Sequence, residues 1–436
     1  MFKIAFCWFL VYLTALLFPN GSFLLNATSL ILWLFTSLYI IYNYKMYSYF
    51  SFVFLWAFTF AGVCCFVIEF GTYLPETQVV TYLTGAITRN LALCFFFIYS
   101  SLFVFQFLEK SNLIDACLPR GINEIIKHIF VIAFLASALS LVYIYIKFGS
   151  PSDYNVDRFY YWENIAPGWG EYVRFILSQL SIFIGVFYVA DKKNKYIYIF
   201  TLGLLSQVLV GEKFSGLFIS LLLFCIPIFV ATGANLAVLA YRYKKALLIV
   251  AFVFPILILT SYTAISGGAS ALTAMSIRLL LQGQMWWGVD SISSIYEPQS
   301  LDIIVSKYLG YGSEYVNQGM YFLMEKISPS SVFEQYSEAG VTFTMAAPVN
   351  NIYFFGFALS ILPTVFIGML SGVAFWFLYR TIVIQDYLLL LISMKFYFLT
   401  IRVATMGDVG YLFSLKTIAY LFIIVLYILM SKFKKT

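Results

Sequence analysis

Charged residues and histidine are scarce in this chain of 436 residues. Only 11% of the residues are charged, and His128 is the single histidine. Soluble globular domains carry about 25% charged and about 45–50% apolar residues. This chain is 62% hydrophobic and 20% aromatic, which is more apolar surface than one water-soluble core can bury. The composition excludes a secreted or cytosolic soluble enzyme and a nucleic-acid-binding protein, and it predicts an all-α integral membrane protein.

Cysteine is also used sparingly, and its spacing excludes two kinds of site. Five of the six cysteines lie in apolar runs, and none has a metal-type spacing between polar loops. No Asp-x-Asp pair marks a cation site on the polar loops, and His128 beside Lys127 is typical of a surface residue. We therefore predict no disulfide framework, no metal ion and no cofactor.

Apolar runs divide the whole chain, residues 1–436, into one polytopic membrane domain. A membrane helix needs about 20 predominantly apolar residues. Runs near this length predict twelve membrane helices, over residues 3–18, 23–42, 49–68, 90–108, 127–147, 173–190, 196–211, 214–233, 246–265, 351–379, 386–401 and 411–430.

The distribution of basic residues predicts the orientation of these helices. With both termini in the cytoplasm, the inner loops carry 15 basic and 5 acidic residues, and the outer side carries 9 basic and 15 acidic residues. Cytoplasmic loops of membrane proteins carry an excess of Lys and Arg. We therefore expect both termini to lie in the cytoplasm, with the net charge of +6 reflecting this bias.

Two outer loops hold most of the polar residues, over 148–172 and 266–350. The second is about 85 residues long, and long loops are typically functional or disordered. It contains an amphipathic helical stretch over 271–287 that ends in Trp286 and Trp287, which we expect to lie against the membrane interface. Gly368 and Gly372 form a GxxxG pattern, which favours close helix packing.

Basic side chains on the outer side are few, and many lie near a predicted helix end. Each one could simply reach toward lipid headgroups. As a set they could form a cationic pocket, because Arg and Lys both bind phosphate oxygens. We expect the set to converge around one hollow that fits a diphosphate; its members are Arg89, Lys147, Arg158, Arg174, Lys213, Arg278, Lys307, Lys326 and Arg402.

Carboxylates and aromatic rings accompany these cations. A general base needs a carboxylate within hydrogen-bond reach of an acceptor hydroxyl. Asp157, Glu163 and Asp290 are candidates, although each could equally be a solvated loop residue. The outer aromatic residues suit either sugar rings or the interfacial belt.

Three short segments resemble the O-antigen polymerases (Wzy type), which belong to the superfamily of lipid-linked polysaccharide polymerases and ligases. They are LSQVLVGEKFSGL from Leu205 to Leu217, RLLLQGQMWW from Arg278 to Trp287, and APVNNIYFFG from Ala347 to Gly356. Lys213 stands where the superfamily has Arg, and Val349 or Asn350 stands where the ligases have His. Arg158–Gly168 and Arg278–Gly288 each enclose nine residues, where the family pattern has ten. The missing His favours a polymerase over a ligase.

The resemblance implies a glycosyltransferase that acts on undecaprenyl-pyrophosphate-linked oligosaccharides at the periplasmic face. The growing chain would pass to the next lipid-linked repeat, and negative charge would develop on the departing pyrophosphate. A chain-length regulator protein is a partner that the family leads us to expect, together with membrane lipid. The catalytic candidates are Arg278, Lys213, Arg158, Asp157, Glu163 and Asp290; the substrate-binding candidates are Arg402, Arg174, Arg89, Glu212, Trp286, Trp287, Asn350 and Asn351.

Two other functions stay open on the sequence. An O-antigen ligase-like glycosyltransferase would share the substrate. A flippase for lipid-linked oligosaccharides should have related halves and ionisable residues along a central cavity. Here only Lys395 and Lys416 fall inside predicted membrane helices, and the halves differ.

Overall fold

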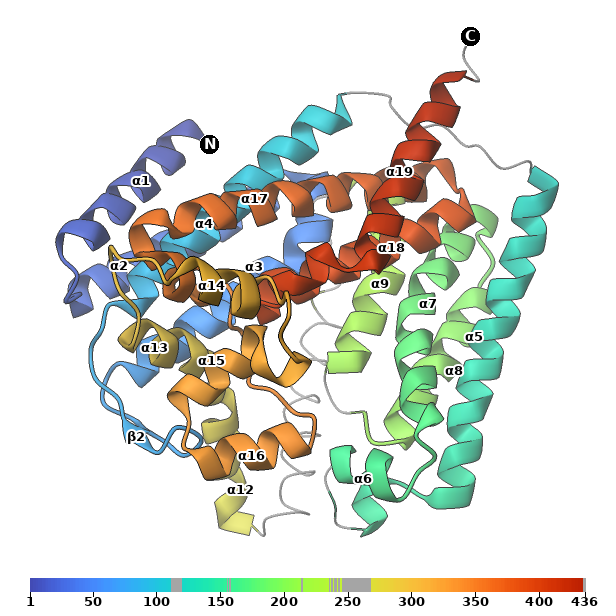
Figure 1. Ribbon diagram of the computed structural model, residues 1–436. Coiled ribbons are helices and arrows are strands. Elements are labelled where there is room, and N and C mark those ends of the chain that lie inside the picture. The colour runs from blue at the N-terminus through green and yellow to red at the C-terminus, as the bar shows by residue number, and fades with distance from the viewer. Residues whose placement is uncertain are drawn as a thin grey trace. The chain divides into compact units, whose positions relative to one another are not determined.

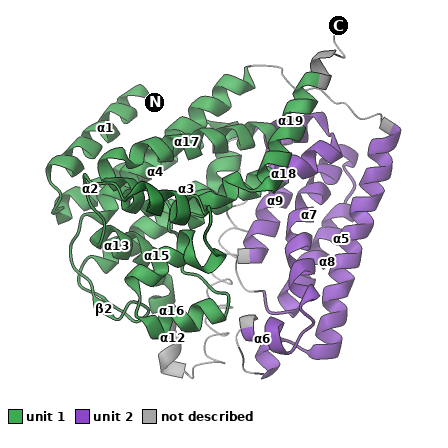
Figure 2. Ribbon diagram, viewed as in Figure 1, with its two compact units in different colours: residues 1–114, 276–377, 395–436 green, residues 115–275, 378–394 purple. Residues whose placement is uncertain are grey.

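The chain folds as two compact units of helices. The structure, a computed structural model, describes residues 1–110, 120–154, 158–212, 215–234 and 268–433, together with residues 156, 236, 238, 241 and 244. Unit 1 comprises residues 1–114, 276–377 and 395–436, and unit 2 comprises residues 115–275 and 378–394 (Figure 2). In the described part, the one sheet has two strands of two residues each, so the predicted all-α class is confirmed.

Unit 1 contains the N-terminal helices and most of the large loop between residues 266 and 350 (Figure 1). Three helices continue from one unit into the other, namely α12, α17 and α18. The elements of unit 1, with these three, are α1 (Phe2–Leu17), α2 (Phe23–Asn43), α3 (Lys45–Ile68), β1 (Tyr73–Leu74), β2 (Val79–Val80), α4 (Ala86–Glu109), α12 (Gly268–Leu280), η2 (Leu281–Gly283), α13 (Gln284–Ser291), α14 (Leu301–Ile303), η3 (Ile304–Tyr308), η4 (Tyr315–Asn317), α15 (Gly319–Ile327), α16 (Ser330–Glu338), α17 (Val349–Ile384), α18 (Tyr387–Ile401), η5 (Arg402–Met406), η6 (Val409–Phe413) and α19 (Leu415–Phe433).

Unit 2 is a smaller set of helices, in which α7 packs against α5, α8 and α9. Phe130 stacks on Phe183 at 4.1 Å between ring centroids, and Phe200 stacks on Phe224 at 4.0 Å. Such ring pairs join the apolar faces of neighbouring helices. The elements of unit 2 are α5 (Arg120–Phe148), η1 (Pro151–Tyr154), α6 (Arg158–Asn164), α7 (Trp169–Asp191), α8 (Lys195–Leu209) and α9 (Ser215–Thr232).

Buried tryptophans form the centre of the N-terminal part of unit 1. Trp8 and Trp33 are fully buried, and their indole N–H groups donate to Thr36 and Thr59 at 3.0 Å and 2.9 Å. A buried indole needs such a partner because its N–H has lost water. These bonds join α1 to α2 and α2 to α3, and all three helices also pack against α4.

The GxxxG pattern packs helices closely, as the sequence predicts. A Cβ atom added at Gly368 would lie 2.6 Å from the carbonyl oxygen of Phe97 on α4, and one added at Gly372 would collide with the backbone of Ser101. Only glycine lets the backbones of α17 and α4 approach this far.

The helices that coincide with the twelve predicted membrane helices differ in length. Seven helices of the described residues are long and apolar enough to cross a membrane, and four shorter apolar helices coincide with predicted ranges. The predicted run 246–265 lies outside the described residues. The described part of the chain is therefore almost entirely α-helical, with several helices long and apolar enough to cross a membrane.

Candidate functional site

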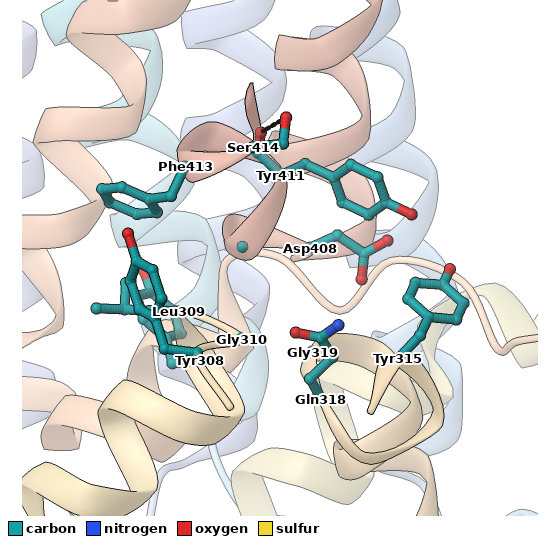
Figure 3. Close-up of a pocket in the computed structure, with 12 residues that line it drawn as sticks. Tyr308, Leu309, Gly310, Tyr315, Gln318, Gly319, Asp408, Tyr411, Phe413 and Ser414 are labelled. Atoms are coloured by element: carbon teal, nitrogen blue, oxygen red, sulfur yellow. Dashed lines mark hydrogen bonds between the residues drawn. The ribbon is translucent and has the colours of Figure 1, made fainter. Parts of the chain in front are cut away.

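A cavity of about 360 Å³ lies within unit 1, between two stretches of chain that are far apart in sequence (Figure 3). One stretch belongs to the large loop, and the other follows α18. In Figure 3, Asp408, Tyr411 and Tyr315 lie on one side of the cavity, and Phe413 and Tyr308 lie on the other. The lining residues are Tyr308, Leu309, Gly310, Tyr311, Tyr315, Gln318, Gly319, Asp408, Gly410, Tyr411, Phe413 and Ser414.

Two π-helical segments lead into this cavity. η3 ends at Tyr308, which lines the cavity, and η5 is followed directly by Gly407 and Asp408. Gly407 has φ +77°, a backbone conformation that residues other than glycine rarely adopt. The turn at Gly407 places Asp408 in the cavity wall. π-Helices are rare and frequently occur at functional sites, because they change the direction of side chains within a helix.

Arg402 is held beside the cavity by three residues of its wall. Its Nε donates to Asp408 at 3.0 Å, and one terminal nitrogen, Nη2, donates to the hydroxyl of Tyr315 at 2.8 Å. The guanidinium carbon lies 3.9 Å from the ring centroid of Tyr411, in cation–π contact. Nη1 has no partner among the described residues, and the Arg402 side chain is 42% exposed. Arg402 therefore keeps donors for a ligand.

Asp408 is a mostly buried carboxylate with one strong partner. Burial raises its pKa above the ordinary value of 3.8, and the nearby Arg402 only partly offsets this effect. The other oxygen accepts a long hydrogen bond of 3.4 Å from the backbone of Met320. A carboxylate whose pKa is raised in a cavity is a better proton acceptor than a solvated one.

The predicted residues Asn350 and Asn351 position the two π-helical segments. Both lie in the first turn of α17 and are buried. Asn351 accepts from the Tyr308 hydroxyl at 2.7 Å, and Asn350 donates to the Gly407 carbonyl at 3.0 Å. These asparagines therefore hold Tyr308 and Gly407 at the two edges of the cavity, and they do not line it themselves.

The other predicted arginines of unit 1 do not line the cavity. Arg89 is buried and binds both oxygens of Asp290, at 2.7 Å and 2.5 Å. Asp290 is 1% exposed at its side chain and is thus part of an ion pair instead of an accessible base. The prediction that the basic residues converge around one hollow is wrong for Arg89 and Arg278, because each is paired with its own carboxylate.

Arg278 belongs to a separate polar cluster around Glu76. Its Nη1 lies 3.3 Å from the Glu76 carboxylate, which also accepts from the Tyr336 hydroxyl at 2.6 Å and from the Gln284 amide. Burial and the bond to Glu76 raise the pKa of Tyr336 to about 12. This cluster joins the turn between β1 and β2, which contains Glu76, to α13 and α16. The local sequence around Glu76 does not indicate this structural role.

Trp286 and Trp287 are buried in unit 1, which corrects the prediction that they lie at the membrane interface. They are 0% and 3% exposed, and their N–H groups donate to the carbonyls of Ala347 and Tyr82. The predicted helical stretch is present as α12, η2 and α13. Its apolar side packs against α3 and α4 of the protein itself.

The remaining predicted residues lie in unit 2 or outside the described part. Arg174 of α7 forms ion pairs with Glu171 and with the buried Glu212. Glu163 is exposed on α6. Arg158 begins α6, and its side chain lies outside the described part, as do Lys213 and Asp157.

Sequence reasoning missed Asp408, Gln318 and Tyr411, and it included the other cavity tyrosines, Tyr308, Tyr311 and Tyr315, only in the general set of outer aromatic residues. The signal available was a polar interruption, RVATMGDVGY, between two apolar runs, where Arg402 and Asp408 stand six residues apart. Tyr315 and Gln318 lie in a loop with no periodic pattern, so their relation to Arg402 depends on tertiary structure.

Comparison with known proteins adds one partial match. A family of unknown function, DUF6418, matches residues 313–421. This range contains eight of the twelve residues that line the cavity, and it also contains Arg402. No curated protein and no solved structure matches the chain.

Proposed function

We propose that this protein is a membrane glycosyltransferase that polymerises lipid-linked oligosaccharides, in the manner of an O-antigen polymerase, at the periplasmic face of a bacterial inner membrane. The observation that carries the proposal is the cavity of unit 1, where aromatic walls, a buried carboxylate and an arginine with a spare donor meet. Aromatic faces beside polar groups are well suited to sugar rings. The resemblance of three short segments to the polymerases agrees with this chemistry.

The residues around the cavity suggest a division of roles. Asp408 would accept the proton of the acceptor hydroxyl as that oxygen bonds to the anomeric carbon of the donor sugar. The bond from that carbon to the diphosphate breaks, and the prenyl diphosphate departs with the electron pair. Arg402 would stabilise the negative charge on the departing group through its spare donor. Asp408 thus replaces Asp157, Glu163 and Asp290 as the proposed base.

Tyrosine rings and Gln318 would hold the sugars. The rings of Tyr311 and Phe413 are tilted relative to one another, with 6.1 Å between centroids, and Tyr315 and Tyr411 meet edge to face at 6.4 Å. The Gln318 amide lines the cavity and has no protein hydrogen-bond partner in the described part of the chain. An amide of this kind can both donate to and accept from sugar hydroxyls.

The test is the surface polysaccharide of a strain that lacks this gene and is complemented with variants. We expect Arg402→Ala and Asp408→Asn to leave lipid A core capped by a single repeat, while the wild type and Lys147→Gln give long chains. Lys147 is exposed in unit 2 and serves as the matched control. Arg402→Lys should restore little, since a point charge cannot contact Asp408, Tyr315 and a ligand together.

The other outcomes identify which alternative holds. Normal chains in Arg402→Ala and Asp408→Asn would overturn the assignment to this cavity, and loss in Arg278→Ala alone would move the site to the Glu76 cluster. Complete absence of capped core in the deletion strain would indicate a flippase or a ligase, because both act on the repeat before or at its attachment.

A further inference from the structure

Two lysines of unit 1 share one aromatic ring close to the cavity. The ammonium of Lys307 lies 5.7 Å from the ring centroid of Phe322, and the ammonium of Lys326 lies 5.2 Å from the same centroid. Both distances are typical of cation–π contacts. The two nitrogens are therefore separated by no more than the sum of these distances, about 11 Å. A diphosphate that accepts a hydrogen bond at each end can bridge such a span.

No carboxylate in the described part of the chain neutralises this pair. Neither lysine forms an ion pair with any residue in the described ranges, although Asp302 and Glu325 are close in sequence. Arg89, Arg174, Arg278 and Arg402 each have a carboxylate within 4 Å. Two like charges over one ring repel each other, and an anion between them removes that repulsion.

The pair is connected to the cavity along two elements. Lys307 belongs to the π-helical η3 and directly precedes Tyr308, which lines the cavity. Lys326 lies on α15, whose first residue, Gly319, also lines the cavity. Gly319 and Lys326 are seven residues apart, which at about 1.5 Å rise per residue corresponds to about 10 Å along the helix. The Phe322 ring packs on Phe354, which in turn contacts Tyr308, so the ring has a fixed position.

We propose that Lys307 and Lys326, which share the Phe322 ring, bind the phosphate or diphosphate ester of a membrane lipid. Two ammonium groups supply up to six donors to the ester oxygens, and the ring limits where those groups can move. Only the identity of the ligand rests on the proposed function: a lipid-linked sugar would place its diphosphate on the lysines and its sugars in the neighbouring cavity. The binding itself requires no glycosyl transfer.

The experiment measures binding of farnesyl diphosphate to the purified full-length protein in dodecyl maltoside micelles, by calorimetric titration. We expect Lys307→Gln/Lys326→Gln to weaken binding about tenfold or more, and Lys147→Gln to bind as the wild type does. Lys147 also lies over aromatic rings, at 5.9 Å and 5.3 Å, but in unit 2 and without a second lysine. Lys307→Arg/Lys326→Arg should retain binding, and raised salt should weaken it in the wild type.

Unchanged affinity in the double Gln variant would overturn the proposal, as would equal binding of uncharged farnesol. A thermal-unfolding control separates lost binding from lost fold. Competition with phosphatidylglycerol distinguishes the source of the phosphate: displacement only by excess phospholipid favours a prenyl diphosphate, and displacement at equal concentration favours a phospholipid headgroup. If the lysine variants lose binding while Arg402→Ala still gives long chains, the lysine site stands and the proposed cavity mechanism fails.

Discussion

Unit 1 contains two arginine–aspartate pairs that have the same chemistry and different surroundings. Arg89 and Asp290 are 5% and 1% exposed at their side chains, and Arg89 also donates to the carbonyls of Pro19 and Thr84. All its nitrogens are therefore occupied by the protein. Arg402 and Asp408 are 42% and 12% exposed, and one nitrogen of Arg402 has no partner among the described residues.

The difference separates a structural arginine from one that can act on a ligand. Arg89 joins α4 to α13 and to two turns of the chain, so its donors serve the fold. Arg402 is fixed by Asp408, Tyr315 and Tyr411 but retains a donor beside a cavity. The two arginines therefore differ in one respect. Every guanidinium nitrogen of Arg89 donates to the protein, whereas Arg402 keeps a nitrogen that can donate to a ligand.

Removing the arginine from each pair gives the largest expected effect. Arg89→Ala leaves Asp290 buried without its partner, which typically costs about 3–5 kcal/mol. Arg402→Ala should cost about 1 kcal/mol or less, because solvent screens an exposed pair and Asp408 can take up a proton. The measurement is the free energy of unfolding of both variants in mixed micelles. Equal destabilisation by the two substitutions would contradict the distinction.

The acid dependence of stability sharpens the comparison at Asp408. Because its folded pKa is raised, the folded protein holds this proton more tightly than the unfolded chain does. The stability of the wild type relative to Asp408→Asn should therefore fall as the pH rises from the ordinary value of 3.8 through the raised folded pKa. Above that pKa the difference should be constant. Other titrating groups cancel because both proteins contain them.

Thermal midpoints of the two proteins between about pH 4 and pH 7 would measure this trend. In an Arg402→Ala background the trend should extend to higher pH, since Arg402 is the group that holds the Asp408 pKa down. A difference that rises with pH would show that the carboxylate is stabilised in its charged form, against the proposed role as base.

Helices were predictable from the sequence because their signal is local. The apolar run 90–108, for example, lies within α4, and the run 196–211 nearly coincides with α8. The runs could not show which helices cross the membrane, since length and hydropathy leave α1, α8, α9 and α19 short of that criterion. The GxxxG packing was also predictable, because glycine spacing directly limits how close two helices can come.

The partners of the charged residues were not predictable, because they lie far apart in sequence. Arg89 and Asp290 are 201 residues apart, and Arg278 and Glu76 are 202 residues apart. Trp286 and Trp287 have the composition of an interfacial anchor, and only tertiary packing buries them. Likewise, the ends of the two π-helical segments are held by hydrogen bonds that Asn351 accepts from Tyr308 and that Asn350 donates to Gly407, both remote in sequence from the asparagines.

The smallest expected effect concerns the hydroxyl that Arg402 contacts. Tyr315→Phe removes the acceptor at 2.8 Å from Nη2 but keeps the ring against Tyr321 and Tyr411. Losing one hydrogen bond at a partly exposed site costs about 0.5–1.5 kcal/mol, so we expect polymer formation to slow by about two- to tenfold with chains still made. The measurement is the rate at which long chains appear after induction in the complemented deletion strain.

Tyr321→Phe is the matched control, since the Tyr321 hydroxyl has no partner in the described part of the chain, and this variant should behave as the wild type. If both variants behave alike, Tyr315 only packs beside Arg402, and its hydrogen bond does not help to position this arginine.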